Sequence, residues 1–269
     1  MIRARCPVCT QPLEPAAGVW RCENGHGFDV ARQGYVNLLT VEQKHSKNPG
    51  DTRAQVAARK EFLDEGHYTF IADAVWEMLA GDRPTSVLDA GCGEGYYLTQ
   101  LQSHLPDVDC WGLDISKEAV RYAAARNKQA QWLVGTAVRL PFADESFDCV
   151  ISMFALTAPA EFARVLKPGG IFLQVLAGEE HLMALKRLIY PEILRREKVL
   201  HPALDGFSLE ESRTLEFPVS LQENCQVQNL FAMTPHYFRI TKEGAENIAA
   251  AASLEDTAQV VLNRFRVTR

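Results

Sequence analysis

The sequence predicts an α/β protein, in which a parallel β-sheet carries helices on both faces and follows a small metal-binding module. Two observations support this prediction. Short apolar runs alternate with helical patterns from residue 86 to residue 176, and this alternation is typical of parallel sheets built from strand–helix–strand units. Ahead of them, three of the seven cysteines lie within the first 22 residues. In a reducing cytosol, such clustering indicates metal binding rather than disulfides.

Each expected element follows from a local pattern of apolar residues. The expected strands of the sheet are 86–89, 110–114, 131–134, 148–154 and 171–176, and the helices between them are 96–105, 117–126 and 160–166. The flanking elements are helices at 52–63, 71–79, 182–194 and 243–252, with added strands at 217–221 and 265–267. In an open parallel sheet, ligands bind beyond the carboxyl ends of the strands.

The first strand of the sheet ends in a glycine-rich turn. Asp89 stands where the strand stops, and Gly91, Gly93 and Gly95 follow it at alternate positions. Because glycine has no Cβ, a ligand can lie against the bare backbone of such a turn. The next strand ends in Asp114, 19 positions after Gly95 (114 minus 95). A carboxylate placed there can accept hydrogen bonds from both hydroxyls of a ribose.

The N-terminal cysteines form a pattern typical of zinc sites. Cys6, Cys9, Cys22 and His26 follow the spacing C-x2-C-x12-C-x3-H, which places two ligand pairs on two tight turns. Three thiolates and one imidazole suit tetrahedral zinc and leave no position open for a substrate, so the site is expected to be structural. The alternative is a set of reduced core thiols without metal. A module this short has too little core to fold without a metal ion.

Charge is distributed unevenly along the chain. Residues 1–60 carry nine Lys/Arg and five Asp/Glu, a net charge of +4, whereas the remainder carries 19 and 29, a net charge of −10. A basic front end on an acidic body indicates contact with a polyanion, and an ordinary solvated surface is the alternative. The chain has no apolar run long enough to cross a bilayer and no signal-peptide pattern. We therefore expect a soluble, cytoplasmic protein with no membrane partner.

These features divide the chain into three parts. Residues 1–36 form the zinc-binding module, residues 37–68 form a basic linker and a helix, and residues 69–269 form the cofactor domain.

At the glycine turn, the chain resembles the S-adenosylmethionine-dependent methyltransferases of the Rossmann-like class I fold. Dinucleotide-binding enzymes usually carry G-x-G-x-x-G, whereas the glycines here alternate behind an acid. The stretches 139–148 and 164–170 agree with the methyltransferase pattern, and the resemblance covers about residues 69–180. It implies S-adenosylmethionine as cofactor. Many relatives carry an acid at the position of Thr136, so here the adenine would be bound by backbone groups or by the hydroxyl of Thr136.

The whole chain is similar to the bacterial 23S rRNA guanine-N1 methyltransferases of the A type. The matching blocks are the zinc ligands and residues 34–39, 49–51, 62–68, 91–97 and 181–183. The resemblance implies methylation of N1 of a guanine in a hairpin loop of 23S rRNA, by a homodimer whose zinc modules grip the RNA. It also implies cofactor contacts from Tyr68, Gly93, Glu94 and His181. His181 and Glu94 are candidates for the base that takes the N1 proton.

One segment departs from the family, and two other functions remain open. Residues 154–159 replace a more usual Tyr/Phe-x-Pro stretch, which leaves the substrate contacts of this segment open. A small-molecule methyltransferase is the first alternative, but it gives the zinc module and the basic linker no role. A zinc-ribbon RNA-binding protein without catalysis is the second, and the intact Asp89, Gly91, Gly93 and Asp114 oppose it.

Overall fold

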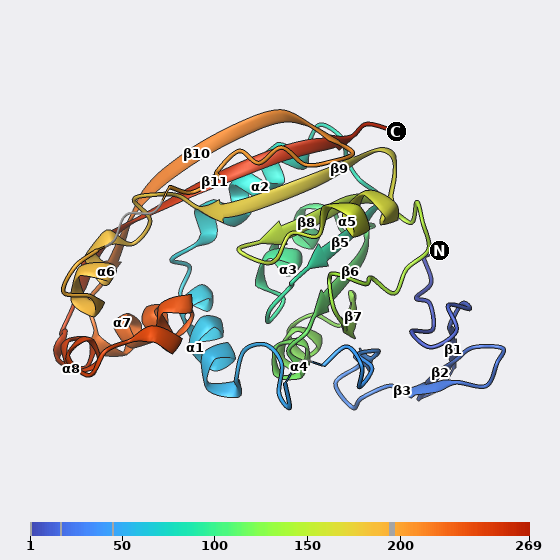
Figure 1. Ribbon diagram of the computed structural model, residues 1–269, viewed down its shortest axis with the longest axis horizontal. Helices are drawn as coiled ribbons and strands as arrows, with labels where there is room; N and C mark the ends of the chain where they lie inside the picture. Colours follow the sequence, from blue (N-terminus) through green and yellow to red (C-terminus); the bar gives the residue numbers. More distant parts are fainter. Residues whose placement is uncertain (1, 17, 45, 194–196) are drawn as a thin grey trace.

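The computed structural model describes residues 2–16, 18–44, 46–193 and 197–269. Among these residues, the chain forms two sheets. The small N-terminal sheet is antiparallel and consists of β1 (Glu14–Ala16), β2 (Val19–Arg21) and β3 (Gly27–Asp29). The large sheet has eight strands in the order β10-β11-β9-β8-β5-β6-β7-β4. Figure 1 shows the small sheet at one end of the molecule and the C-terminal helices at the other.

The large sheet is parallel from β4 to β9 and antiparallel beyond β9. Its strands are β4 (Val36–Asn37), β5 (Ser86–Ala90), β6 (Asp109–Asp114), β7 (Gln131–Val134), β8 (Phe147–Met153), β9 (Leu166–Ala177), β10 (Phe207–Leu221) and β11 (Leu254–Val267). The predicted α/β class is confirmed, as are the added strands, which pair antiparallel to one another and to β9. Because these strands are parallel, the carboxyl ends of β5, β6, β7 and β8 all lie on the same side of the sheet, and ligands bind beyond such strand ends.

The helices mostly match their sequence patterns. They are α1 (Arg53–Asp64), α2 (Thr69–Leu79), α3 (Tyr96–His104), α4 (Lys117–Arg126), α5 (Pro159–Val165), α6 (Met183–Ile189), α7 (Asn224–Ala232) and α8 (Lys242–Ala250), with a 3-10 turn η1 (Pro235–Arg239). Helix α1 begins at a capping box, because Thr52 accepts from the backbone of Gln55 while the Gln55 side chain accepts from the backbone of Thr52. No helix of the described residues has the length and apolarity that a membrane span requires.

The C-terminal part differs from the sequence-based expectations in three ways. The helix expected at 182–194 ends at Ile189, and residue 194 lies outside the described residues. Helix α7 was not expected at all. The two added strands are much longer than predicted, because β10 and β11 pair along their whole lengths. The first half of β10 is polar and largely exposed, so its apolar pattern was too weak to indicate a strand.

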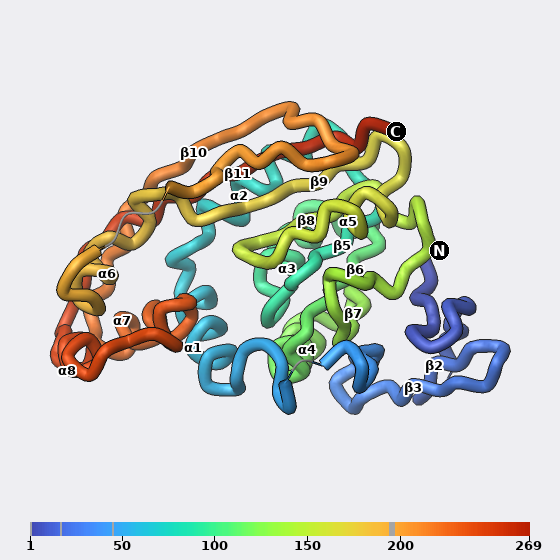
Figure 2. The backbone as a smooth tube through the Cα atoms, in the orientation of Figure 1, coloured from blue at the N-terminus to red at the C-terminus, as the bar shows by residue number. Residues whose placement is uncertain are grey.

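The zinc-binding module packs directly on the large sheet. The backbone N–H of Arg5 donates to the carbonyl of Pro141 over 2.7 Å, and the ring of Trp20 meets the ring of Trp111 edge-on, with centroids 6.2 Å apart. Strand β4 lies at the border between the module and the linker and pairs with β7. Figure 2 shows the chain continuing from there past α4 to α1. The module therefore shares its buried surface with the sheet instead of standing apart.

Gly112 in β6 is required by the packing beneath the ligand edge of the sheet. A Cβ at this position would collide with the ring of Trp132, which is buried and whose Nε1–H donates to the carbonyl of Asn127 over 2.8 Å. We expect Gly112→Ala to lower the free energy of unfolding by about 1–3 kcal/mol, as overpacked cores do. Urea denaturation measures this change.

Gly81→Ala is the matched control, because a Cβ on Gly81 would have no atom within 4 Å. We expect the control to unfold at the wild-type urea concentration. Equal unfolding midpoints for Gly112→Ala and wild type would contradict the packing role of this glycine.

Candidate functional site

The four predicted zinc ligands converge on one point. Their ligand atoms all lie within 4.8 Å of one another. Cys9 Sγ is 3.6 Å from Cys22 Sγ, and His26 Nδ1 is 3.6 Å from Cys6 Sγ and 3.4 Å from Cys22 Sγ. Two sulfurs bound to one zinc at about 2.3 Å and at the tetrahedral angle stand about 3.8 Å apart. The donor set and its spacing fit a structural zinc ion.

The backbone favours a thiolate in this cluster. The N–H of Gln11 is the main cause that lowers the pKa of Cys9, to about 6. The thiolate is the form of cysteine that binds metal. A tight turn thus prepares one ligand before the ion arrives.

The glycine turn joins the end of β5 to α3. The N–H groups of Gly91 and Cys92 both donate to the carbonyl of Leu113, at 2.8 and 3.0 Å, which ties the turn to β6. A Cβ on Gly91 would stand 2.5 Å from the Cβ of Ala155, and a Cβ on Gly95 would press on Trp132 and Ala123. At these two positions it is packing within the protein that requires glycine.

Gly93 is the glycine of the turn where a Cβ would meet no atom closer than ordinary contact distance. It has a positive φ of 54°, and the atom nearest to a Cβ there would be Arg59 Nη1, at 3.6 Å. Its N–H donates to Asp114 Oδ2 over 3.0 Å, and the other oxygen of Asp114 accepts from the N–H of Ser116 over 2.7 Å. Each carboxylate oxygen can accept a second hydrogen bond. Asp114 therefore shapes the turn and keeps capacity for ribose hydroxyls.

Asp89 lies at the end of β5 and is 1% exposed. Neither of its oxygens has a hydrogen-bond partner among the described residues, and burial, followed by the charges of Asp114 and Glu94, raises its pKa well above the usual value. An unpaired buried carboxylate is costly and favours a cationic partner. S-adenosylmethionine carries an ammonium and a sulfonium, so the unpaired acid and the glycine turn fit this cofactor.

Tyr68 and His181, far apart in the sequence, lie close together in the fold. Their ring centroids are 6.4 Å apart, and the ring of Phe154 is 6.1 Å from that of His181. The hydroxyl of Tyr68 is buried and has no partner among the described residues. His181 Nδ1 is 2.9 Å from the carbonyl of Gln259. Because a carbonyl only accepts, Nδ1 carries the proton and Nε2 remains an acceptor.

Glu94 lies on the other side of the turn, between two arginines. Its side chain is 2% exposed, and its Oε1 is 3.8 Å from Arg126 Nη2. Burial raises the pKa of Glu94, while the charges of Arg59 and then Arg126 act in the opposite direction. Of the two candidate bases, Glu94 is thus surrounded by positive charge and His181 by aromatic rings.

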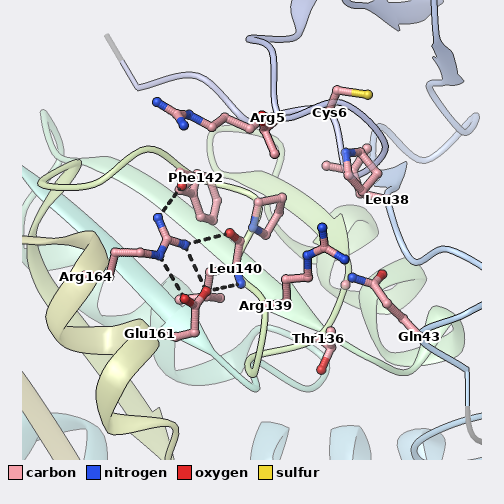
Figure 3. A pocket seen from close by; sticks show the side chains of 14 residues that line it. Arg5, Cys6, Leu38, Gln43, Thr136, Arg139, Leu140, Phe142, Glu161 and Arg164 are labelled. Atoms are coloured by element: carbon pink, nitrogen blue, oxygen red, sulfur yellow. Dashed lines mark hydrogen bonds and ion pairs between the residues drawn. The ribbon is translucent and has the colours of Figure 1, made fainter.

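Thr136 follows the carboxyl end of β7 and lines a cavity of about 230 Å³ at the seam between the zinc module and the sheet. Arg5, Arg139 and Arg164 line it together with Leu38 and Phe142, among others. Figure 3 shows Arg164 bonded to Glu161 and to the backbone of Leu140 and Phe142.

The other two arginines of the seam cavity are exposed. Among the described residues, the guanidiniums of Arg5 and Arg139 have no hydrogen-bond partner, and the nearby acids Asp144 and Glu42 interact with them only through charge. Gly135, which lines the cavity, donates its N–H to the carbonyl of Asp114 over 3.0 Å, and the side chain of Asp114 accepts from Gly93 of the glycine turn.

The sequence did not identify three residues near the site: Arg59, Phe154 and Gln259. Arg59 stands in an ordinary helical pattern, and Gln259 belongs to a strand that the sequence did not indicate. Phe154 had one available signal, because the segment that begins with it departs from the family pattern. In the structure, Phe154 adopts a positive φ of 54° and is 40% exposed, a conformation that is strained for a bulky side chain.

The zinc site makes a direct prediction. Cys9→Ser removes one of four ligands, so we expect the zinc content to fall from about one ion per chain to near zero, with a lower melting temperature. Atomic emission measures the metal, and calorimetry measures the melting. Cys225→Ser is the matched control, because Cys225 is exposed and is not one of the clustered residues. Wild-type zinc content in Cys9→Ser would contradict the assignment.

His181 predicts how stability depends on pH. Burial lowers its pKa from 6.5 to about 4, so the folded protein keeps this imidazole neutral where the unfolded chain protonates it. The resulting stabilisation is complete above pH 6.5 and is lost as the pH falls towards 4, by about 3 kcal/mol in all. Urea denaturation at several pH values measures it. We expect His181→Gln to lose this part of the pH dependence, and an unchanged pH dependence would refute the assignment.

Two family models match the chain. A zinc-ribbon model described as "RlmA, N-terminal" matches residues 4–47, and a model described as "Methyltransferase domain" matches residues 87–170. The first covers all four clustered metal ligands, and the second covers the glycine turn and Asp114.

Three relatives match over longer stretches. The 23S rRNA (guanine(748)-N(1))-methyltransferase of Streptomyces fradiae is 40% identical over 190 residues, which are 67% of this chain and 65% of the relative, slightly under two thirds. A "Putative 23S rRNA (guanine-N(1)-)-methyltransferase" of Micromonospora griseorubida is 41% identical, over 67% of this chain and 68% of the relative. The protein of the same description from Bacillus subtilis (strain 168), YxjB, is 29% identical over 95% and 94%. The chain belongs to the family of 23S rRNA (guanine-N1)-methyltransferases.

Proposed function

We propose that this protein transfers a methyl group from S-adenosylmethionine to N1 of a guanine in a hairpin loop of 23S rRNA. The observation that carries the proposal is the connection between its two sites. The seam cavity borders the zinc module and bears two arginines whose guanidiniums have no hydrogen-bonded partner among the described residues, and Gly135, which lines the cavity, donates its N–H to the carbonyl of Asp114. RNA phosphates that contact the arginines would thus lie beside the cofactor site.

The proposed cofactor residues are those expected from the sequence. They are Tyr68, Asp89, Gly91, Gly93, Glu94, Gly95, Asp114, Thr136 and His181. Asp89 would pair with the ammonium group of the cofactor, and Asp114 would accept from its ribose. Because Gly91 and Gly95 are packed against protein atoms, their part is to shape the turn. The position of Thr136 in the seam cavity supports a contact at the outer end of the site.

The chemistry asks little of the protein beyond positioning. S-adenosylmethionine supplies an activated methyl group when it is bound. Guanine N1 must lose its proton, and the neutral His181 offers Nε2 as an acceptor for it. With a pKa of about 4, His181 is a weak base, so its main contribution would be to orient N1. The exposed ring of Phe154, held beside His181, would stack against the splayed base.

The domain division, the oligomeric state and the location are also proposals. We propose three functional units: the zinc-binding module at 1–36, the linker and helix at 37–68, and the cofactor domain at 69–269. The zinc-binding module would both contact the RNA and support the sheet. The homodimer and the cytoplasmic location follow from the family resemblance.

A labelling experiment tests the function and its alternative. The protein is incubated with methyl-labelled S-adenosylmethionine and either 23S rRNA or a metabolite extract. We expect label in the RNA as 1-methylguanosine. Asp114→Asn should lower cofactor affinity roughly 10-fold or more, because a hydrogen bond to a charged acceptor is lost. Label in a metabolite alone would favour a small-molecule methyltransferase.

Arg139→Glu separates RNA binding from cofactor binding in the same assay. This exposed arginine lines the seam cavity, and its contact with the neighbouring Thr136 is a backbone hydrogen bond of 3.2 Å, which a change of side chain leaves in place. We expect cofactor affinity to stay at the wild-type value, while RNA binding weakens and depends less on salt. Unchanged RNA binding would refute the role of the seam cavity.

A further inference from the structure

Arg59 of α1 reaches across the linker to the glycine turn. Its Nη2 forms an ion pair with Asp51 Oδ2 at 2.5 Å and donates to the carbonyl of Met233 over 3.4 Å. Its Nη1 points to the other side and lies 3.6 Å from the position that a Cβ on Gly93 would occupy. Among the described residues, Nη1 has no hydrogen-bond acceptor. One half of the guanidinium is thus fixed, and the other half faces the candidate cofactor site.

The surroundings of Arg59 are acidic. Burial acts to lower the pKa of Arg59, but Asp51, Glu94 and Asp114 raise it above the ordinary value. The guanidinium therefore stays charged. The acids of the site, Asp89 included, suit the cationic groups of S-adenosylmethionine and would repel its single anionic group, the α-carboxylate of the methionine part.

A carboxylate in this crevice needs a cation with a free donor. The other arginine beside the turn, Arg126, has two of its three nitrogens bonded, and its third, Nη2, has no hydrogen-bond partner among the described residues but lies 3.8 Å from the carboxylate of Glu94. Its Nη1 bonds to Asp64 Oδ1 at 2.6 Å, and its Nε bonds to the carbonyl of Glu94 at 3.2 Å. Arg59 combines a fixed orientation with an open donor, which is the arrangement that arginine uses to bind carboxylates.

We propose that Arg59 binds the α-carboxylate of S-adenosylmethionine through Nη1, and that Asp51 orients the guanidinium for this contact. The inference rests on the proposed function, in which this crevice holds the cofactor. It assigns the linker helix a direct part in cofactor recognition. It also explains why the segment containing Asp51 is fixed to α4, where Ser116 Oγ donates to the carbonyl of Asp51 over 2.7 Å.

Calorimetric titration with two ligands tests the contact. The ligands are S-adenosylmethionine and its decarboxylated form, which keeps the sulfonium and the ammonium and lacks only the carboxylate. We expect the wild-type protein to prefer the complete cofactor roughly 10- to 100-fold. Arg59→Met should lose this preference and bind the decarboxylated form as the wild type does. Unchanged binding of that form also shows that the variant is folded.

Two further variants complete the design. Arg59→Lys keeps the charge but not the planar pair of donors, so we expect a reduced preference. Arg53→Met is the matched control, because Arg53 is exposed on the same helix, and it should keep the full preference.

The outcomes separate this inference from the proposed function. If Arg59→Met kept the preference for the complete cofactor, or lost affinity for both ligands equally, the proposed carboxylate contact would be wrong. The proposal that this crevice binds the cofactor would then still hold. If the wild type bound neither ligand, the proposed function would be overturned, and this inference with it.

Discussion

The carboxylate of Asp114 is the constraint on which the site depends. One oxygen holds the N–H of Gly93 and the other holds the N–H of Ser116, so one side chain fixes both the glycine turn and the start of α4. Ser116 in turn holds the carbonyl of Asp51. These hydrogen bonds join β6 to the glycine turn, to α4 and, through Ser116, to the linker. Loss of this carboxylate would loosen the frame as well as remove the proposed contact with the cofactor ribose.

The zinc-binding module depends on its metal for order and contributes packing to the large sheet. The metal orders two tight turns that have little core of their own, and Trp20 then packs on Trp111 of β6. The same strand ends in Asp114. The contact between Trp20 and Trp111, followed by the last residues of β6, therefore links the zinc-binding module to the candidate cofactor site. The module is part of the protein's frame, which a separately folded domain would not be.

The sequence was sufficient for the parts of the structure that are formed by residues close together in the chain. The zinc ligands, the glycine turn and the acids that end β5 and β6 were all predicted, because local spacing and strand order determine them. Arg59, Phe154 and Gln259 were not, since tertiary packing brings them to the site from distant helices, loops and strands. The polar first half of β10 escaped prediction for a related reason. This half is a strand because it pairs with β11, since its own sequence has no strand pattern.

The two-residue strand β4 has a consequence for how the chain assembles. Val36 and Asn37 pair with Leu133 and Val134. During synthesis, β4 therefore leaves the ribosome almost one hundred residues before β7. Until β7 emerges, the front of the nascent chain has a metal cluster but no sheet edge to join. Closing so wide a loop is slow compared with forming a hairpin. This outermost parallel pair therefore cannot form until the chain from β5 to β7 has been synthesised.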